Sequence, residues 1–326
     1  MVFSKFKILL VLFVSLILLT AGAGCDTSSA GLKSFSLGNS GGSRSVTKED
    51  DFSGTKGLNI QFMEGRPPSE IYKDSPFSIG FTVKNEGAFD VQDGAVCFGS
   101  LSEDVFSKPD TCLPLGNLYG RRNMIGGESK EYIEEGYNFK LDYRLDTNYP
   151  IKGKACYSYE MNIPFSVCLK SLEVGAENSC NTGMLTLTPS SQGGPIQIVS
   201  IKEDIIPTEN QNEIMLTILL KNTDAGKVYD SSSISSGSCP SISDSAIKNK
   251  AKITVSLPGE YGTAKCTPAN YAMFDNSGNA KVICKEIYYE KDKSYPLEAN
   301  INLKFGYVIE KEGTFKLKAK MNQNVV

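Results

Sequence analysis

The feature that most constrains this chain is an export-type N-terminus that precedes an even set of cysteines. Lys5 and Lys7 form a short basic stretch, and Ile8 to Leu19 is an apolar run interrupted only by Ser15. Small residues then lead to Cys25. This order is typical of a secretory signal, and an exported chain enters an oxidising compartment in which thiols tend to pair. The sequence therefore predicts an exported protein that is held together by disulfides.

Residues 1–25 are compatible with three outcomes. The apolar run is short for a membrane span, which needs about 20 residues. Cleavage at Ala21-Gly22-Ala23 would release a soluble protein, whereas Ala23-Gly24-Cys25 resembles the end of a lipoprotein lipobox, in which Cys25 becomes lipidated. Gly22 departs from the leucine that is usual in that motif, and an uncleaved anchor is the third outcome.

A flexible linker is predicted over residues 26–55, which are rich in Ser and Gly and almost without large apolar side chains. Such a composition buries too little surface to offset chain entropy. A linker directly after a membrane-proximal cysteine would hold a domain away from a surface, so we favour anchoring over free secretion. The sequence ends at Val326 without a C-terminal sorting signal, which also leads us to expect the tether at the N-terminus.

The cysteines after Cys25 are eight in number, which allows all of them to pair. Local pairing is the simplest arrangement and joins Cys97 with Cys112, Cys168 with Cys180, and Cys266 with Cys284. It leaves Cys156 and Cys239, which either bridge the two halves of the chain or are mispaired in this scheme. Each bridge is expected to contribute on the order of 3 kcal/mol. A zinc site is not expected, because no Cys-x-x-Cys motif and no His is present.

The fold predicted beyond residue 55 is all-β. Short runs alternate apolar and polar residues between Gly, Asn and Pro turns, which is typical of antiparallel strands, and helical periodicity is nowhere sustained. A turn-rich boundary at Pro189–Pro195 suggests two tandem Ig-like β-sandwiches, over residues 56–192 and 193–326. The clearest predicted strands are Leu58–Phe62, Phe77–Val83, Ala95–Phe98, Tyr137–Tyr143, Lys154–Tyr159, Met184–Thr188, Ile196–Ile201, Ile214–Leu220, Lys252–Leu257, Lys281–Cys284, Leu297–Phe305 and Thr314–Lys318.

The two halves share a local pattern. Each contains a strand that ends in Lys-Asn, then a small-residue turn, then Val six positions after the Asn. The Asn residues are Asn85 and Asn222, and the Val residues are Val91 and Val228. Asn favours a turn because its side chain hydrogen-bonds to nearby backbone. We therefore predict matching sandwich corners, with each Val returning to the buried side of a sheet.

This pattern resembles the Ig-like modules of cell-surface proteins, in particular the CARDB adhesion-type module. More broadly, the chain is similar to archaeal surface proteins with two such domains, which are largely uncharacterised. The resemblance implies a fold and a location at the cell surface rather than an activity. The stretches that carry it are Gly57–Phe62 with Pro67-Pro68, Lys154–Tyr159, Cys168, Cys180, Gly193–Ile196, and Lys265–Pro268 with Cys284.

The sequence contains few candidate catalytic or metal-binding residues. The absence of His removes the commonest general base and any Ser-His or Cys-His pair, and no phosphate-binding or dinucleotide-binding motif is present. The acidic clusters are expected to be solvated surface in turn-like surroundings. One of them, Asp90 with Asp93, is weighed as a calcium site, but its spacing fails the EF-hand pattern and a hairpin turn is favoured. The remaining clusters are Glu49-Asp50-Asp51 and Glu131 with Glu134-Glu135.

We therefore expect no catalytic residue, cofactor or metal. A net charge of −3 with scattered Lys and Arg argues against a nucleic-acid partner. The predicted function is a non-enzymatic, exported cell-surface protein that acts as a structural or adhesive element, with a membrane contact through its N-terminus and protein partners at the surface. The alternative is a ligand-binding or accessory subunit of an envelope complex, which a polar, concave junction between the domains would favour. An extracellular hydrolase is a third and weaker hypothesis.

Overall fold

The computed structural model describes residues 54–142, 144–187, 192–240 and 247–319. The predicted signal or anchor, Cys25 and residues 26–53 of the predicted linker lie outside these ranges. The described residues belong to one compact unit that spans residues 43–326. Within the described ranges, no helix is long and apolar enough to cross a membrane.

The described chain is built from β-strands, which confirms the all-β prediction. Two short 3-10 turns, η2 (Ser231–Ser233) and η3 (Gly259–Tyr261), are the helical elements that accompany them in these ranges. The strands are β1 (Leu58–Phe62), β2 (Glu70–Ile71), β3 (Pro76–Asn85), β4 (Gly94–Gly99), β5 (Thr111–Pro114), β6 (Ser129–Asn138), β7 (Thr147–Leu169), β8 (Met184–Thr186), β9 (Ile196–Pro207), β10 (Gln211–Asn222), β11 (Lys227–Tyr229), β12 (Lys250–Ser256), β13 (Lys265–Thr267), β14 (Tyr271–Met273), β15 (Asn279–Glu290) and β16 (Tyr295–Leu317).

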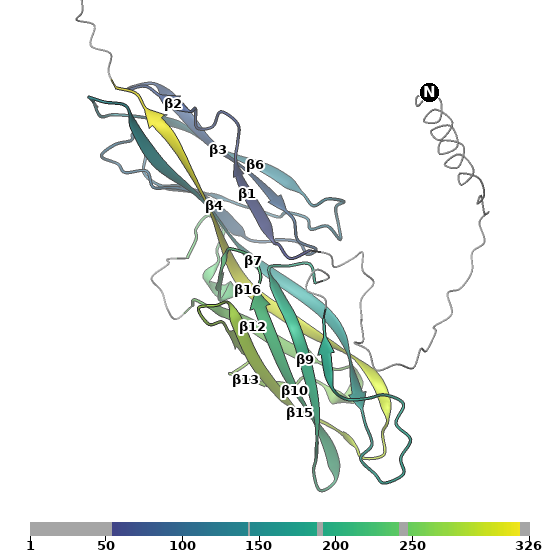
Figure 1. Ribbon diagram of the computed structural model, residues 1–326. Helices are drawn as coiled ribbons and strands as arrows, with labels where there is room; N and C mark the ends of the chain where they lie inside the picture. The colour runs from purple at the N-terminus through teal and green to yellow at the C-terminus, as the bar shows by residue number, and fades with distance from the viewer. Residues whose placement is uncertain (1–53, 143, 188–191, 241–246, 320–326) are drawn as a thin grey trace, which may run out of the picture. The chain divides into compact units, whose positions relative to one another are not determined.

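These strands form three sheets (Figure 1). One has the order β1-β3-β6, a second has the order β13-β15-β10-β9-β8, and the third and largest contains β14-β12-β16-β7-β4-β5, with β2 and β11 also paired to β16. The three-stranded sheet packs against one half of the largest sheet; for example, the rings of Phe81 (β3) and Phe98 (β4) lie 5.0 Å apart. The five-stranded sheet faces the other half, where the Tyr289 hydroxyl of β15 donates to the Lys170 carbonyl just after β7. We call these two packed units the first and second sandwich.

A single antiparallel ladder joins the two sandwiches. Strands β7 and β16 are each 23 residues long and pair without interruption, from Thr147 opposite Leu317 to Leu169 opposite Tyr295. Residues 147–156 and 308–317 belong to the first sandwich, and residues 158–169 and 295–306 belong to the second. The predicted boundary between residues 192 and 193 therefore does not separate the sheets, because segments from both sides of it build the largest one.

The length of β16 corrects the sequence prediction, which placed separate strands at Leu297–Phe305 and Thr314–Lys318. Gly313, which falls between these two predicted strands, lies inside the ladder opposite Ile151. A side chain at Gly313 would meet the ring of Phe62 at 2.6 Å. Glycine stands here because the two sheets approach closely, not because the chain turns.

The strand predicted at Tyr137–Tyr143 is also wrong in its position. The strand is β6, which ends at Asn138 and begins at Ser129. The sequence analysis placed the acidic residues at the start of this strand in turn-like surroundings. In the structure they belong to the strand: Tyr132 and Tyr137 are buried, and Glu131 is exposed. A strand with one charged face at the edge of a sheet produces this pattern.

The main core is one contiguous cluster of apolar side chains that runs through both sandwiches. In residues 157–166 of β7, buried residues alternate with more exposed ones, whereas β4 is buried along nearly its whole length. The first sandwich combines many aromatic rings with aliphatic side chains, whereas the second is filled mainly by Ile, Leu and Val from β9, β10, β12 and β15. Because the cluster does not break at the junction, the two sandwiches share buried surface there.

The described residues contain four disulfides, and they are the pairs considered from the sequence. Cys97 and Cys112 lie directly opposite each other in β4 and β5, and Cys266 and Cys284 do so in β13 and β15. The other two bridges are Cys168–Cys180, which closes a short loop after β7, and Cys156–Cys239. The last of these connects the middle of β7 to the segment after β11, so it bridges the two halves of the chain.

Candidate functional site at the junction of the two sandwiches

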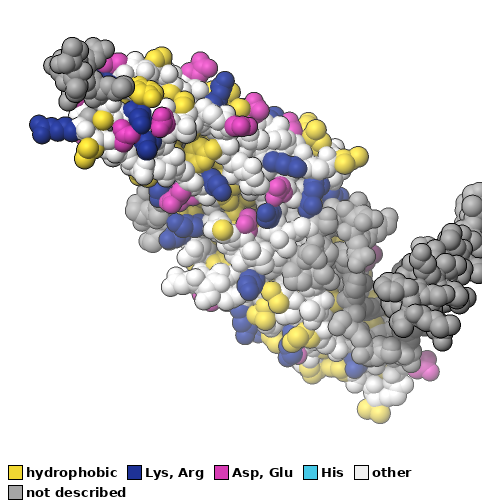
Figure 2. All heavy atoms as spheres, turned by 45° about the horizontal axis from the view of Figure 1, so that its top comes forward, with side chains coloured by type: hydrophobic (Ala, Val, Ile, Leu, Met, Phe, Trp, Pro, Cys, Tyr) yellow, Lys and Arg dark blue, Asp and Glu magenta, His cyan; other side chains and the backbone are white. Residues whose placement is uncertain are grey.

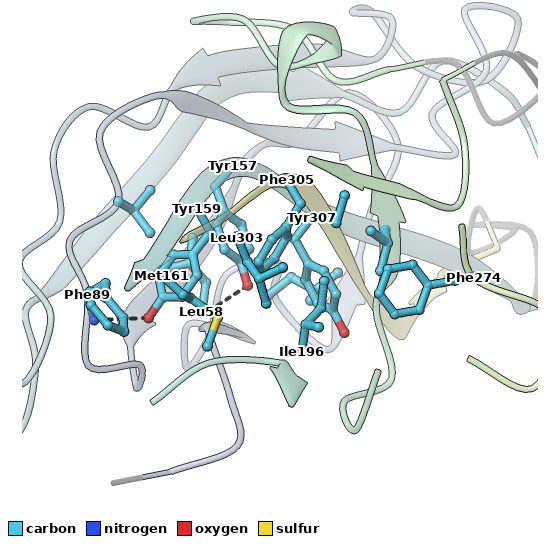
Figure 3. Close-up of a cluster of buried hydrophobic side chains, with 14 of the residues drawn as sticks. Leu58, Phe89, Tyr157, Tyr159, Met161, Ile196, Phe274, Leu303, Phe305 and Tyr307 are labelled. Atoms are coloured by element: carbon cyan, nitrogen blue, oxygen red, sulfur yellow. Dashed lines mark hydrogen bonds between the residues drawn. The ribbon is translucent and has the colours of Figure 1, made fainter. Parts of the chain in front are cut away.

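The junction is held by three buried tyrosines from the shared ladder (Figure 3). The Tyr157 hydroxyl accepts a hydrogen bond from the Leu58 N–H at 3.0 Å. The Tyr159 hydroxyl accepts from the Phe89 N–H at 3.1 Å and donates to the Gly193 carbonyl at 2.9 Å. These contacts tie β7 to β1, to the loop after β3 and to the segment before β9.

The third tyrosine, Tyr307 of β16, donates to the Asn222 side-chain oxygen at 2.8 Å. Its ring lies 5.8 Å from that of Tyr157, which is directly opposite in the ladder. Together with Tyr159 and Phe305, these rings form a closed circuit of neighbouring pairs, with centroid separations of 5.8–6.1 Å. Edge-to-face and tilted pairs at such distances stabilise a core beyond their area burial. The junction is therefore packed and hydrogen-bonded rather than hinged.

The two corners predicted from the sequence have the same hydrogen-bond pattern. Asn85 accepts from the Gly87 N–H at 3.0 Å and donates to the Phe89 carbonyl at 2.9 Å. Asn222 accepts from the Asp224 N–H at 3.4 Å and donates to the Gly226 carbonyl at 2.8 Å. In both corners the side chain thus bonds the backbone two and four residues further on. The following Val91 and Val228 are buried, as predicted.

The structure explains why these corners contain small residues, which the sequence alone did not. A side chain at Gly87 would meet the Tyr159 hydroxyl at 2.0 Å. A side chain at Gly226 would meet the Tyr307 ring at 2.3 Å. The corners must therefore be small because a tyrosine from the ladder packs directly onto each of them.

The corner contacts predict unequal losses of stability. Asn85 is fully buried and also donates to the Leu118 carbonyl at 3.0 Å, so Asn85→Ala leaves three buried backbone groups without this partner. We expect the free energy of unfolding to fall by about 3 kcal/mol, and by roughly half as much for the partly exposed Asn222→Ala. Urea denaturation of both variants measures this. Equal losses below about 1 kcal/mol would show that the corners are not fixed by these side chains.

Burial of the tyrosines predicts a loss of stability in alkali. Burial raises the pKa of Tyr132 to about 12 and raises the pKa of Tyr157, Tyr159 and Tyr307 as well, against about 10 in an unfolded chain. The unfolding free energy should hold below about pH 10 and fall as the pH rises through the folded-state pKa values. Phenolate absorbance should show these buried tyrosines ionising only as circular dichroism is lost. Ionisation of all 15 tyrosines near pH 10 with dichroism intact would contradict this.

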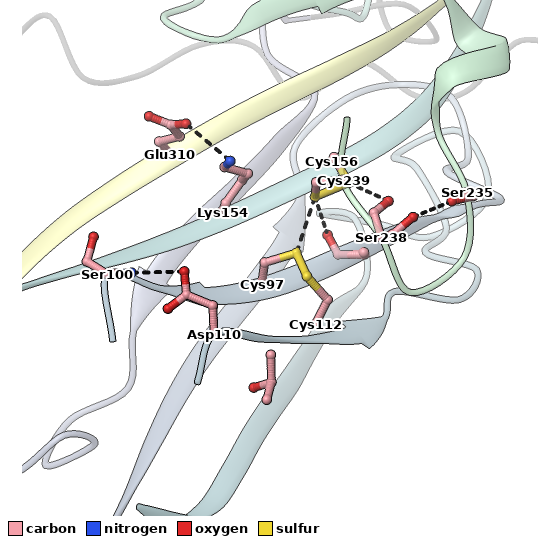
Figure 4. Close-up of a disulfide and its surroundings, with 12 residues drawn as sticks. Cys97, Ser100, Asp110, Cys112, Lys154, Cys156, Ser235, Ser238, Cys239 and Glu310 are labelled. Atoms are coloured by element: carbon pink, nitrogen blue, oxygen red, sulfur yellow. Dashed lines mark hydrogen bonds and ion pairs between the residues drawn. A yellow bond between two sulfur atoms is a disulfide. The ribbon is translucent and has the colours of Figure 1, made fainter. Parts of the chain in front are cut away.

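The opposite face of the shared sheet carries a second, smaller core at the junction (Figure 4). The segment that follows β11 covers it and is fastened by the Cys156–Cys239 bridge. Cys156 is fully buried, and its Sγ lies 3.4 Å from the Ser238 carbonyl. The buried members of this cluster are Ala95, Cys97, Cys156, Tyr229, Ile234 and Val308.

A polar groove of about 510 Å³ also lies at the junction. The loop after β3 and Arg122 with Asn123 form one side, and outward-facing side chains of the ladder form the other. Its charged residues are of both signs, and Glu160 pairs with Lys304 at 3.6 Å. The face shown in Figure 2 likewise has acidic and basic side chains interspersed, without a large patch of one sign. The groove-lining residues are Ala88, Phe89, Asp90, Gln92, Asp93, Arg122, Asn123, Ser158, Glu160, Asn162 and Lys304.

The acidic clusters weighed in the sequence do not converge on a common centre. Asp90 accepts from the Gly120 N–H and from the Asn123 side-chain amide, both at 2.7 Å, so it orders the groove loop. Glu134 is not in a turn but in β6, where it pairs with Lys108 at 2.9 Å. Residues 49–51 lie outside the described ranges. Among the described residues, no group of three or more His, Cys, Asp or Glu side chains is placed to hold a metal ion.

Sequence reasoning missed the role of the three tyrosines. It assigned no hydrogen-bonding role to Tyr157, Tyr159 or Tyr307, and it did not single out the polar groove. The available signal was the choice of Tyr in place of Phe at positions expected to be fully buried, because a buried hydroxyl requires a hydrogen-bond partner. The groove is assembled from segments that are distant in the chain, so no local sequence pattern predicts it.

Comparisons with known proteins leave the family open. No family model matches the chain, and no curated protein matches it. Among solved structures, it is similar to the serine-rich repeat adhesion glycoprotein Srr1 from Streptococcus agalactiae, with 7% identity over 85% of this chain and 95% of that chain and a TM-score of 0.17. It is also similar to the collagen adhesin CNA from S. aureus, with 10% identity over 86% and 96% and a TM-score of 0.10. Both TM-scores are too low to carry an argument, and the resemblance to CARDB modules stays a prediction.

Proposed function

We propose that the protein is a non-enzymatic, exported cell-surface element that acts in a structural or adhesive role and is tethered through its N-terminus. The observation that carries this proposal is the uninterrupted ladder of β7 and β16, which joins the two sandwiches through one continuous sheet. Two sandwiches joined only by a linker would bend relative to each other. A shared sheet with a common core transmits force and orientation from one end to the other.

Disulfide content supports the proposed location. All eight described cysteines are bonded, an arrangement typical of proteins that fold in an oxidising compartment. Disulfides stabilise the folded state by restraining the unfolded chain, which is useful to a protein outside the cell, where chaperones are absent. The absence of His from the chain is in keeping with a role that requires no general base.

Location and redox state test this proposal together. Intact cells that produce the full chain are treated with a membrane-impermeant amine reagent, and the native protein is then alkylated before and after reduction. We expect surface labelling and eight thiols that react only after reduction, with the mass of the mature N-terminus distinguishing lipid on Cys25 from cleavage before Gly24. Unlabelled protein whose eight cysteines react without reduction would refute the proposal.

The polar groove favours a second candidate function, that of a ligand-binding or accessory subunit. The groove is concave and polar, and it lies at the junction of the two sandwiches, where such a site was expected. The rigid Cys156–Cys239 bridge weighs against closure of the sandwiches around a ligand.

Retention on cell envelopes separates the two candidates. Purified wild-type protein and a Glu160→Arg variant are added to envelopes that lack the endogenous protein. Glu160 is exposed, so the variant is expected to fold. A loss of retention by at least about tenfold would favour binding through the groove, and unchanged retention would favour the structural role. Glu64→Arg, at an exposed position in the turn after β1 and outside the groove, is the matched charge control.

A further inference from the structure

Two disulfides are in contact on the outer face of the largest sheet (Figure 4). Cys97 Sγ, bonded to Cys112, lies 3.5 Å from Cys239 Sγ, which is bonded to Cys156. This separation meets the distance requirement of a near-attack arrangement. A thiolate released on Cys97 would therefore already stand against the neighbouring disulfide.

Solvent access selects the point at which a reaction would start. Of the eight described cysteines, Cys112 alone is exposed; Cys239 is intermediate and the other six are buried. Thiol–disulfide exchange depends on which sulfur an attacking thiolate can reach. Attack on Cys112 Sγ makes Cys97 the leaving thiolate, and Cys97 is the cysteine in contact with the second bridge.

We propose that Cys112 is a capture site for a low-molecular-weight thiol. In the first step, the external thiolate bonds to Cys112 Sγ, the Cys97–Cys112 bond breaks, and its electron pair remains on Cys97. In the second step, the Cys97 thiolate bonds to Cys239 Sγ, the Cys156–Cys239 bond breaks, and Cys156 takes a proton from water. Two disulfides are present before and after, so the sequence needs no oxidant or reductant beyond the entering thiol.

The second step makes the capture persistent. A free Cys97 thiolate beside a mixed disulfide on Cys112 would expel the bound thiol rapidly, because the two residues lie directly opposite each other with Cα atoms 4.0 Å apart. Exchange with Cys239 consumes that thiolate. The product thiol on Cys156 has an acceptor in place, since its Sγ lies 3.4 Å from the Ser238 carbonyl. The segment after β11 also stays fastened, now to β4 in place of β7.

Peptide mapping of the folded wild-type protein tests the proposal. Full-length protein is incubated with free cysteine without denaturant, quenched in acid, alkylated in denaturant and mapped without reduction. We expect cysteine bound to Cys112, a new Cys97–Cys239 bridge and alkylated Cys156. No adduct on Cys112, or an adduct with Cys97 alkylated and Cys156–Cys239 intact, would overturn the proposal.

The Cys266–Cys284 bridge is the internal control for access and contact. It is also a directly opposed cross-strand pair with Cα atoms 4.0 Å apart, but both cysteines are buried, and no other disulfide of the described residues touches it. We expect adduct formation there to be at least roughly tenfold slower than on Cys112. Equal rates at the two bridges would mean that general opening, not the exposed sulfur, controls the reaction.

Two variants test the second step without an added thiol. Cys112→Ser leaves Cys97 unpaired beside Cys239, and we expect Cys97–Cys239 in amounts comparable with Cys156–Cys239. Cys284→Ser leaves Cys266 unpaired without a neighbouring bridge, and we expect Cys266 to remain a thiol with the other three bridges intact. Retention of a free Cys97 in the first variant, or scrambling in both, would overturn the proposal. If Cys112→Ser does not fold, the wild-type map still decides.

Discussion

Replacing Tyr159 with alanine is expected to lower the free energy of unfolding by about 5 kcal/mol, the largest effect of any single substitution proposed for this protein. Removal of a fully buried aromatic side chain costs about 3–5 kcal/mol, and Tyr159 is 1% exposed in the core shared by the two sandwiches. The variant also leaves the Phe89 N–H and the Gly193 carbonyl without their hydroxyl partner, which adds about 1–3 kcal/mol. Urea denaturation of wild type and variant under identical conditions measures the difference.

Two controls separate packing from hydrogen bonding at this position. Tyr159→Phe keeps the ring and should lose only about 1–3 kcal/mol. Tyr288→Ala removes a tyrosine that is 44% exposed on β15, and its effect should stay within about 0.5 kcal/mol. A loss below about 2 kcal/mol for Tyr159→Ala would mean that the junction does not depend on this side chain.

Removal of the Cys156–Cys239 bridge is expected to lower the free energy of unfolding by about 4–5 kcal/mol. The two cysteines are 83 residues apart, and restraint of the unfolded chain grows with the length of the closed loop. The double variant Cys156→Ala with Cys239→Ala removes both partners, so that no free thiol is left to exchange. Its midpoint and slope in urea, compared with those of wild type, give the loss.

The Cys168–Cys180 bridge is the matched control for loop length. Its cysteines are 12 residues apart, and the corresponding double alanine variant should lose about 3 kcal/mol. The order of the two effects is the decisive result. A larger loss from the short loop would contradict the interpretation that Cys156–Cys239 stabilises mainly by linking distant segments.

Sequence patterns predicted the local features of this fold well. The alternation of Leu58–Phe62 matches β1 at both ends, and cysteine spacing suggested three of the four bridges. Asn85 and Asn222 were found because an Asx corner is encoded within a few residues. Each of these features depends on neighbours in the chain, so a single sequence contains the information.

Features that depend on distant segments were not predictable in the same way. Gly313 looks like a turn residue, and only its contact with Phe62 in another sheet shows why it lies within a strand. The uninterrupted pairing of β7 with β16 was hidden for the same reason, since it joins segments about 150 residues apart. The contact between Cys97 and Cys239 depends on that ladder and on the segment that covers it, so spacing alone cannot reveal it.

Differential scanning calorimetry of the full chain, with its disulfides intact, tests most directly whether the two sandwiches are one structural unit. The shared ladder and continuous core predict a single transition whose calorimetric enthalpy equals its van't Hoff enthalpy. The same variant, Tyr159→Ala, should shift that transition as a whole. Two separated transitions in the wild-type protein, one for each sandwich, would contradict the account.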